Sequence, residues 1–557
     1  MLRMSNLLSV AAALSILILV AVPVAFILLQ AVFPEFTRGS LAGAFSRLDV
    51  FTQNARLMQQ TQNSLMLSAC VMVGSLLIGG PIGVLRGLFR VPGARVWDVV
   101  FLIPFLIPPF IAATAWIMML QPRGYLFQLL GFDLGWLLFS FGGVAFVMVL
   151  NLFPLVYFAV SRALEVVGSR FAMAARVSGA GPVQAFFLIT LPLAIPAIAA
   201  SLLIVFAMSI EEFGTPAALA ARTGFEVLVT GIYTRLSDYP IDLSGAALGS
   251  LILMCLALAA FFLQNWIATR RSYIAQSGKP APVDKIELGL WRVPVLALFT
   301  LVALIGVIIP LAAILLTSLM GTISGGVSLS NMSLRHYDQI LASGSRAMQA
   351  LQNSGWLALM TAGLAGLIGA MVAVIVVRGT GRGRQVMDAL SILPNAIPSI
   401  VLAVGIILAW NSPFLPVTLY GTAGILLVAY TAILLPFPIR YAVARLRQIG
   451  ISLDDAARVS GATQGQTIRH VLLPLMAPSL IAAMMLVFAI ASRELVASVM
   501  LAPAGLRTIG TFVFSQFEQG SVQAGMAMSV IAITVTATIL MAVNIWLARR
   551  GAGAFSG

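Results

Sequence analysis

The heptapeptide Ala174-Ala175-Arg176-Val177-Ser178-Gly179-Ala180 occurs a second time, unchanged, as Ala456-Ala457-Arg458-Val459-Ser460-Gly461-Ala462. The two copies are 282 residues apart, and the same offset relates Leu191-Pro192-Leu193 to Leu473-Pro474-Leu475. An unbroken seven-residue match, followed by a second match at one offset, indicates an internal duplication. The chain is therefore predicted to contain two homologous halves.

The duplication extends toward the amino terminus at a slightly larger offset. Gln62-Asn63-Ser64 returns 290 residues later as Gln352-Asn353-Ser354. The same offset relates two proline pairs, which are Pro104 with Pro108 and Pro394 with Pro398. Because each pair spans one helical turn, it is predicted to kink the helix that contains it. A shorter loop in the second half explains the change of offset.

The composition indicates a membrane protein. Of the 557 residues, 60% are hydrophobic and 9% are charged, whereas about 25% are charged in a soluble domain. Twelve apolar runs are long enough to cross about 30 Å of hydrocarbon. These runs are 7–33, 63–85, 97–120, 140–160, 192–212, 243–267, 292–318, 353–377, 387–411, 419–439, 474–492 and 523–547. The predicted fold class is all-α and polytopic, with about 12 transmembrane helices.

The spans divide into two sets of six. The predicted first half is 1–267, the cytoplasmic linker is 268–291, and the second half is 292–557. An even number of spans gives both halves the same orientation, so a pseudo-two-fold axis along the membrane normal is expected, as in transporters with parallel repeats.

Cys70 and Cys255 lie in apolar runs and are predicted to be buried free thiols.

The charge distribution predicts the orientation. With both termini in the cytoplasm, the inner face holds 22 of the 32 lysines and arginines and 7 acids, while the outer face holds 10 bases and 11 acids. This asymmetry agrees with the positive-inside rule. The net charge of +14 is then explained by basic helix ends beside anionic lipid headgroups, and nucleic acid is not an expected partner.

A polar stretch on the cytoplasmic side carries the duplicated heptapeptide in each half. We call 165–192 the first polar segment and 447–474 the second polar segment. In each, the alanines and arginine favour helix, a glycine ends it, and a short second helix is expected to lead back into the membrane at the Leu-Pro pair. Small alanines beside an arginine are suited to docking against a partner surface.

These segments resemble the hallmark of type I permease subunits of ATP-binding-cassette importers, which is Glu-Ala-Ala, then Gly, then Ile or Val, then Leu-Pro. The resemblance implies that each segment forms a coupling helix seated on one of two cytoplasmic ATPase subunits. It identifies the ATPase-coupling residues as Met173, Ala174, Ala175, Arg176 and Gly179 in the first copy, and Asp455, Ala456, Ala457, Arg458 and Gly461 in the second.

The chain has no phosphate-binding loop of its own, because no Gly-x-x-x-x-Gly-Lys-Ser/Thr motif occurs. No cofactor is therefore expected on this chain, and ATP and Mg are expected on the partner ATPase. It is not expected to be an enzyme. ATP-driven closure of the partners would move the coupling helices and rock the two halves between inward-open and outward-open states.

Acidic residues lie at the outer ends of the fifth and eleventh spans, at equivalent positions. Glu212 and Glu494 are related by the offset of 282. Twenty residues at about 1.5 Å each span about 30 Å, which places these acids near the external boundary. The candidate pathway or gate residues are Glu211, Glu212, Ser492, Arg493 and Glu494. Solvated helix ends, with Arg493 neutralised locally, are the alternative interpretation, and no metal site is assigned.

The stretches Glu-Glu-Phe-Gly-Thr-Pro-Ala-Ala-Leu from 211 and Ser-Arg-Glu-Leu from 492, in a fused two-half chain, are similar to permeases of the ferric-iron uptake subgroup. This resemblance implies that the chain moves Fe(III) across the cytoplasmic (inner) membrane of a bacterium, after a periplasmic binding protein has delivered it. Polyamine, thiamine and 2-aminoethylphosphonate remain alternative substrates.

An ion-coupled secondary transporter is the alternative class. Such a transporter normally needs ionisable residues inside its spans, whereas the acids of this chain lie near the predicted helix ends. A polytopic enzyme lacks a catalytic constellation.

The two copies differ at the leading acid of the motif, which is Asp455 in the second copy and Met173 in the first. A carboxylate at a helix start gains about 0.3–1 kcal/mol from the helix dipole and is able to pair with a basic partner residue. We therefore expect Asp455→Ala to reduce ATPase coupling more than Met173→Ala in the reconstituted complex. Equal and negligible losses would contradict unequal coupling.

Overall fold

The computed structural model describes residues 2–46, 54–220, 223–270, 285–379, 382–415 and 418–549. In these ranges the backbone forms helices and two isolated β-bridges, with no strand. Nine described helices are long and apolar enough to cross a membrane, and three further pairs of bent helices raise the number to as many as twelve. The prediction of an all-α polytopic fold is confirmed.

The contacts divide the chain into two compact units. Unit 1 comprises Met1–Gln53, Ile232–Met254 and Ser333–Gly557, and unit 2 comprises Asn54–Gly231 and Cys255–Met332. Two helices have residues in both units, α13 (Leu228–Ser237) and α14 (Leu243–Arg270). The units describe packing, whereas the two halves proposed above describe sequence duplication.

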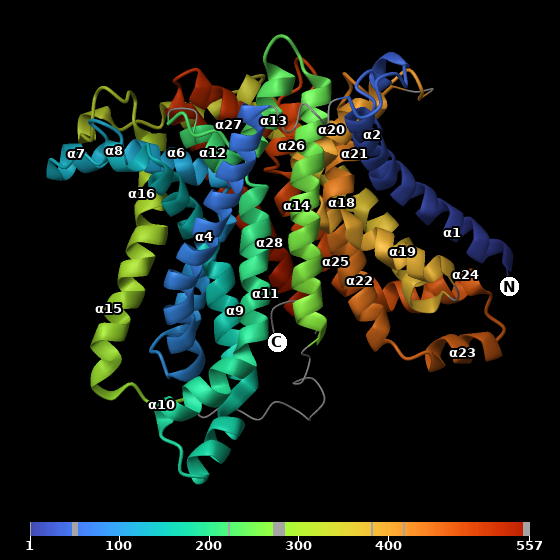
Figure 1. The fold of residues 1–557 in the computed structure, drawn as a ribbon, viewed down its shortest axis with the longest axis horizontal. Helices are drawn as coiled ribbons and strands as arrows, with labels where there is room; N and C mark the ends of the chain where they lie inside the picture. The colour runs from blue at the N-terminus through green and yellow to red at the C-terminus, as the bar shows by residue number, and fades with distance from the viewer. Residues whose placement is uncertain are drawn as a thin grey trace. The chain divides into compact units, whose positions relative to one another are not determined.

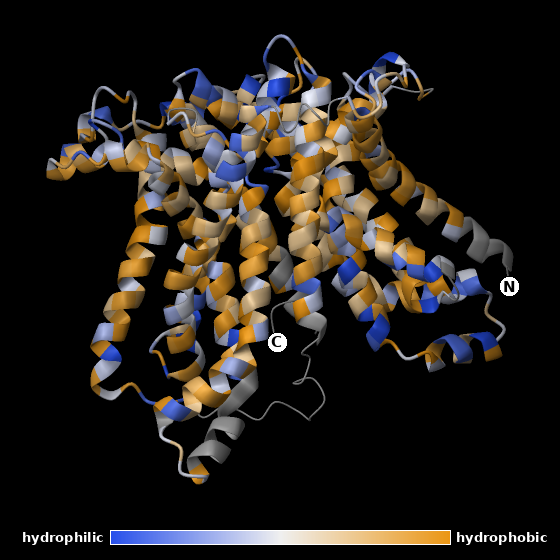
Figure 2. Ribbon diagram, viewed as in Figure 1, coloured by the Kyte–Doolittle hydropathy of each residue, from blue (hydrophilic) through white to orange (hydrophobic). Residues whose placement is uncertain are grey.

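Unit 2 is built around three long helices that lie side by side, α4, α9 and α11 (Figure 1). Its helices are α4 (Ala55–Leu88), α5 (Ala94–Leu106), α6 (Pro109–Leu120), α7 (Tyr125–Leu130), α8 (Gly135–Leu138), α9 (Phe141–Val177), α10 (Pro182–Ala185), η3 (Phe186–Thr190), α11 (Leu191–Ile210), α12 (Gly214–Leu219), η5 (Gly289–Trp291), α15 (Arg292–Ala303), η6 (Leu304–Ile308), α16 (Ile309–Leu319) and η7 (Leu329–Asn331). Hydrophobic residues follow α15 along most of its length, as a lipid-facing span requires (Figure 2).

Unit 1 is built around α18, α22 and α25, which pack against one another. Its helices are α1 (Leu2–Ile16), η1 (Leu17–Ala21), α2 (Val22–Val32), η2 (Phe36–Arg38), α17 (Arg335–Leu341), α18 (Arg346–Arg378), α19 (Arg382–Ile392), η8 (Leu393–Ala396), α20 (Ser399–Trp410), α21 (Ala423–Leu434), α22 (Pro436–Gln448), α23 (Ser452–Val459), α24 (Gln464–Thr467), η9 (Ile468–Leu472), α25 (Leu473–Ala491), α26 (Val496–Leu501), α27 (Ile509–Glu518) and α28 (Val522–Arg549).

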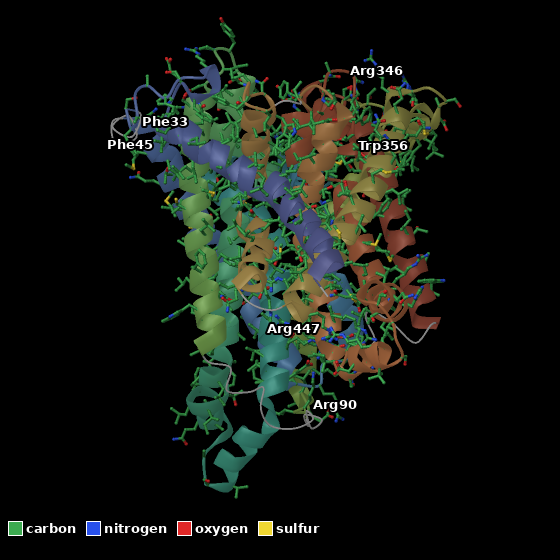
Figure 3. All side chains as sticks on the ribbon, turned by 90° about the vertical axis from the view of Figure 1, so that its right-hand side faces the viewer. Phe33, Phe45, Arg90, Arg346, Trp356 and Arg447 are labelled. Atoms are coloured by element: carbon green, nitrogen blue, oxygen red, sulfur yellow. The ribbon has the colours of Figure 1, made fainter. Side chains whose placement is uncertain are left out.

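The long helices of unit 1 cross from one end of the unit to the other. Figure 3 shows Arg346 and Trp356 of α18 toward one end, where Phe33 also lies, and Arg447 of α22 toward the opposite end. Separation of these arginines to opposite ends is what a membrane crossing requires, because neither charge is stable in hydrocarbon.

The first span of each repeat packs among helices of the other repeat. In unit 1, α2 packs on α20, where a Cβ added at Gly405 would lie 2.5 Å from the carbonyl oxygen of Pro23. In unit 2, α16 packs on α6, and η6 contacts α5. Glycine at 405 thus allows two helix backbones to approach closely.

The paired prolines break their spans instead of kinking them. The angle between Ala94–Leu106 and Pro109–Leu130 is 94°, and the angle between Gly383–Ala396 and Ser399–Trp410 is 108°. Ile107 and Ile397, which precede the second proline of each pair, are extended, because a proline ring excludes the helical conformation from the residue before it. The expected kinks are therefore corrected to breaks near a right angle.

Four single-turn π-helices occur in the described chain, and a proline lies two residues after the end of each. Pro23, Pro192, Pro310 and Pro474 follow η1, η3, η6 and η9 at the first or second helical position. Proline has no N–H to donate, so a wider turn accommodates the missing hydrogen bond without breaking the span. The Leu-Pro pairs of both polar segments are two of these sites, and the short helices α10 and α24 are continuous with the spans that follow.

The prediction of buried thiols is wrong. Cys70 on α4 and Cys255 on α14 are both exposed. In a soluble protein an apolar run that contains cysteine is usually interior, but a membrane span turns one apolar face to lipid. An apolar sequence therefore does not distinguish the protein interior from the lipid-facing surface.

Two glycines of α18 provide a test of helix packing. A Cβ at Gly369 would lie 2.7 Å from Pro438 Cβ and 3.0 Å from the Pro438 carbonyl carbon, whereas a Cβ at Gly363 would meet nothing within 4 Å. We expect Gly369→Ala to lower the free energy of unfolding by about 1–3 kcal/mol through overpacking against α22. Gly363→Ala, the matched control, is expected to leave it unchanged or to raise it slightly. Thermal unfolding in detergent measures both, and equal effects would contradict the close helix approach.

Candidate functional site

The two polar segments are held on different supports. In the first, α9 runs without interruption from the membrane span to Val177. In the second, α22 ends at Gln448, Ile449 is extended, and α23 begins at Ser452 as a separate short helix (Figure 1). Both helices end beside a glycine with positive φ, +93° at Gly179 and +82° at Gly461. The predicted glycine stop is therefore present in both copies, because glycine adopts this conformation readily.

The structure places the coupling residues of the second copy on an exposed helix. Asp455, Ala456 and Arg458 are exposed on α23, while Ala457 is half-buried. Figure 2 shows hydrophilic residues on this helix, away from the apolar spans of its unit. In the first copy, the backbone of Met173, Ala174, Ala175 and Arg176 lies in α9, and their side chains lie outside the described residues.

One residue of the heptapeptide was not singled out by the sequence analysis. Val177 and Val459 occupy the same position in the two copies, and each is 90% exposed. An exposed apolar side chain on a polar segment loses favourable burial unless a partner covers it. The signal was present in the sequence, because valine occurs at the same place in both copies of a stretch that is otherwise small or polar.

The acidic residues after the fifth and eleventh spans have equivalent contacts. The Thr215 N–H donates to both carboxylate oxygens of Glu212, at 3.1 and 3.0 Å. The Ala497 N–H donates to Glu494 Oε1 at 3.1 Å. Each carboxylate thus accepts from the first turn of the short helix that follows it, α12 or α26. A helix N-terminus stabilises negative charge, so both acids have a structural role whatever else they do.

The short helices attach these acids to the most buried part of each unit. In unit 2, α12 packs on α6, and in unit 1, α26 packs on α20. The helices α6 and α20 are the second parts of the two broken spans and are almost wholly buried. Each acid is therefore fixed relative to the break of a proline-containing span.

The remaining candidate pathway residues lie at the same bends. Ser492 is buried, and its hydroxyl donates to the Ala489 carbonyl at 3.1 Å. Arg493 is half-buried, as is Glu211. Burial lowers the pKa of Arg493, while the neighbouring Glu494 acts in the opposite direction. These contacts position the residues at the ends of α11 and α25.

The repeated Gln-Asn-Ser motif anchors a helix start in each unit. Ser64 Oγ accepts from the Leu228 N–H at 2.7 Å, and Ser354 Oγ accepts from the Ile509 N–H at 2.8 Å. The preceding asparagines bind the same two loops. Asn63 donates to the Glu226 carbonyl, and Asn353 donates to the Arg507 carbonyl. The Gln-Asn-Ser motif therefore joins α4 to α13 in one repeat and α18 to α27 in the other.

A charge cluster in unit 2 holds the end of the linker. Arg86 binds Asp98 at 2.7 Å and Glu165 at 2.9 Å, and Lys285 binds the same Glu165 at 2.8 Å. Tyr157 also donates to Asp98, at 2.6 Å. No pattern in the sequence predicted that Asp98 and Glu165 share Arg86 as a partner, because the three residues lie in different helices. Linker residues 271–284 lie outside the described residues.

No group of three or more histidine, cysteine, aspartate or glutamate side chains arranged to hold a metal ion occurs in the described part of the chain. Glu211 and Glu212 are adjacent in sequence, but they are not part of such a group. The candidate pathway residues therefore do not form a resident metal centre within these ranges.

Comparison with known proteins assigns the family. The model of the binding-protein-dependent transport system inner membrane component matches twice, at residues 79–273 and 364–551. The chain belongs to this family of ABC importer permeases. It is a fused permease with both family regions in one polypeptide, and it is a multi-pass inner membrane protein.

Relatives of two kinds are similar to this permease. The ferric transport system permease protein FbpB of Actinobacillus pleuropneumoniae is 29% identical over 490 residues, which cover 86% of this chain and 70% of the relative. A Haemophilus influenzae protein named as a candidate ferric transport system permease, FbpB 1, is 30% identical over 80% of this chain and 70% of the relative. A Salmonella paratyphi A protein named as a candidate 2-aminoethylphosphonate transport system permease, PhnV, is 28% identical over 42% of this chain and 86% of the relative.

The enclosed position of Glu212 generates a prediction about pH. Burial raises the pKa of Glu212 from an ordinary 4.5 to about 7, although the Thr215 N–H opposes the shift. The folded chain then holds the proton more tightly than the unfolded chain, so the free energy of unfolding falls as the pH rises between about 4.5 and 7. We expect Glu212→Gln to reduce this pH dependence, as measured by thermal unfolding. Asp338→Asn, which changes an exposed carboxylate, is the control, and an unaltered pH profile in Glu212→Gln would contradict the assignment.

Proposed function

We propose that this permease imports ferric iron delivered by a periplasmic binding protein, driven by two copies of a cytoplasmic ABC ATPase that bind ATP and Mg. The observation that carries the proposal is the pair of identical heptapeptides that expose the same valine on both polar segments. An apolar side chain with alanine, arginine and glycine beside it in sequence is suited to a groove in a partner. Burial of the valine would contribute affinity, and the charge of the arginine would fix the orientation of the segment in the groove.

Energy transfer from partners of this kind follows from how the segments are attached. The first polar segment continues directly from α9, and the second leads through η9 into α25. Displacement of either segment by an ATPase subunit would therefore move helices that cross the membrane. Glu212 and Glu494 lie two and three residues after the ends of α11 and α25, so the same movement would reach the candidate gate.

The orientation is part of the proposal. The end of unit 1 that carries Arg447 is assigned to the cytoplasm, together with both termini, because basic residues accumulate on that side of the predicted topology. The outward carboxylates would offer transient oxygen contacts to a hard cation, whose preferred ligands are oxygen atoms. Binding selectivity would reside mainly in the periplasmic binding protein.

Ferric iron is favoured over 2-aminoethylphosphonate by the extent of the similarity. The two ferric permeases match at least 80% of this chain, across both repeats, whereas the phosphonate permease matches 42%. Phosphonate is the second candidate because a relative carries that name. Polyamine and thiamine rest on general resemblance among such permeases.

Reconstitution tests the function directly. The chain is placed in liposomes with its co-purifying ATPase and with candidate binding proteins, and ATP hydrolysis and labelled-substrate uptake are measured. We expect an iron-loaded binding protein to stimulate both activities. Stimulation by a phosphonate-loaded protein alone would overturn the choice of iron, and uptake without any ATPase would overturn the ABC mechanism.

A variant pair tests the proposed docking surface in the same assay. Val459→Asp places a charge at the proposed contact and is expected to reduce stimulated hydrolysis by about tenfold or more, since burying an unpaired charge at an interface is costly. Leu329→Asp changes a residue that is 87% exposed but distant in sequence from either polar segment, and it is expected to have no effect. Equal activity of the two variants would contradict docking through Val459.

A further inference from the structure

A buried ion pair connects α23 to the end of α18. The Arg378 Nε atom lies 2.6 Å from Asp454 Oδ2, and the two side chains are 16% and 11% exposed. Asp454 lies in the first turn of α23 and is the buried residue of that helix. Because both charges are largely removed from water, the loss of one would leave the other poorly compensated.

The same arginine also holds the chain just before α23. Its Nη2 atom donates to the Ile449 carbonyl at 2.8 Å. Ile449 is the extended residue at which the helical path from α22 is interrupted. One guanidinium group thus contacts both sides of the break, and its planar set of several donors makes such simultaneous contacts geometrically favourable.

A cavity of about 100 Å³ lies between α23 and its neighbours. Its lining includes the apolar residues Val374, Ile451, Ile468 and Leu472 beside Arg378 and Asp454. The helix packs on α24 and η9, which follow it in sequence. The ion pair supplies a direct connection from α23 to α18, a long helix of the unit.

The first repeat has neither residue of this pair. The repeat offsets place Leu88 at the position of Arg378 and Ala172 at the position of Asp454. There the helix α9 continues unbroken through 37 residues to Val177, so the backbone itself connects the span to the polar segment. A continuous helix transmits displacement through its hydrogen-bonded backbone, whereas a break requires another connection.

We propose that Arg378 and Asp454 are positioning residues that transmit displacement of α23 to α18, in place of the continuous helix of the first repeat. The inference rests on the proposed ATPase coupling. It makes the two repeats mechanically different even though their heptapeptides are identical in sequence. The pair acts by holding the segment, and neither residue contacts the transported substrate.

The test uses the full chain in liposomes with its ATPase and its stimulating binding protein. The variants are Arg378→Gln, Asp454→Asn and the charge-swapped double variant Arg378→Asp with Asp454→Arg. The matched control is Arg384→Gln, which changes an exposed arginine of α19. The measurements are ATPase association, ATP hydrolysis and substrate transported per ATP.

We expect the single variants to retain ATPase association while transport per ATP falls by about tenfold, because a buried charge is left without its partner. The charge-swapped variant is expected to recover a substantial part of the loss, and Arg384→Gln is expected to match the wild type. A purely structural contribution would lower yield and thermal stability without changing transport per ATP in the folded fraction. That result, or single variants that transport as well as the wild type, would overturn the role of the pair.

A second measurement keeps the proposal testable if the neutral variants fold poorly. Arg378→Lys retains the charge but loses the guanidinium geometry that reaches Ile449, and it is expected to fold and to show an intermediate coupling ratio. If Arg378→Lys transports as much substrate per ATP as the wild type, the proposed contact of Arg378 with both Asp454 and Ile449 is overturned. If the wild-type chain itself shows no ATP-dependent uptake, the proposed function fails, which is a result distinct from failure of the ion pair.

Discussion

The need of a membrane helix to satisfy its backbone hydrogen bonds internally is the constraint on which the rest of the structure depends. Water is absent from the hydrocarbon region, so a proline within a span disturbs hydrogen bonding that water cannot replace. Two local arrangements recur at prolines of this chain, while Pro81 and Pro154 lie inside α4 and α9 without either. A π-turn precedes Pro23, Pro192, Pro310 and Pro474 and leaves the span continuous. A break near a right angle occurs at the paired prolines.

The breaks determine where polar residues are able to lie. They produce α6 and α20, which are almost wholly buried and on which α12 and α26 pack. The carboxylates of Glu212 and Glu494 bind the starts of α12 and α26. A pair of acids at span ends thus becomes part of the interior arrangement of each unit. The same geometry explains why a capping role and a role in the pathway are compatible, since a carboxylate that accepts one N–H retains capacity to accept others.

Sequence reasoning predicted what depends on periodicity, length and repetition. The spans, the duplication and the glycine stops at 179 and 461 follow from such patterns. It did not predict that the prolines break their spans, because a kink and a break require the same residues. It misplaced Cys70 and Cys255, because lipid and protein interior select similar side chains. Partners distant in sequence, such as Arg378 with Asp454, are set by tertiary packing, which local patterns do not encode.

The two repeats have diverged in how they support the polar segment, while the heptapeptide that each segment carries is unchanged. One heptapeptide begins in the last turn of the unbroken α9, the other begins in the short helix α23, which an ion pair holds, and both expose valine to the same extent. If each segment met a different protein, nothing would require the two heptapeptides to be identical. Identical heptapeptides on unlike supports are expected when both meet the same partner surface, because a change in either copy would then weaken a contact that the partner makes twice.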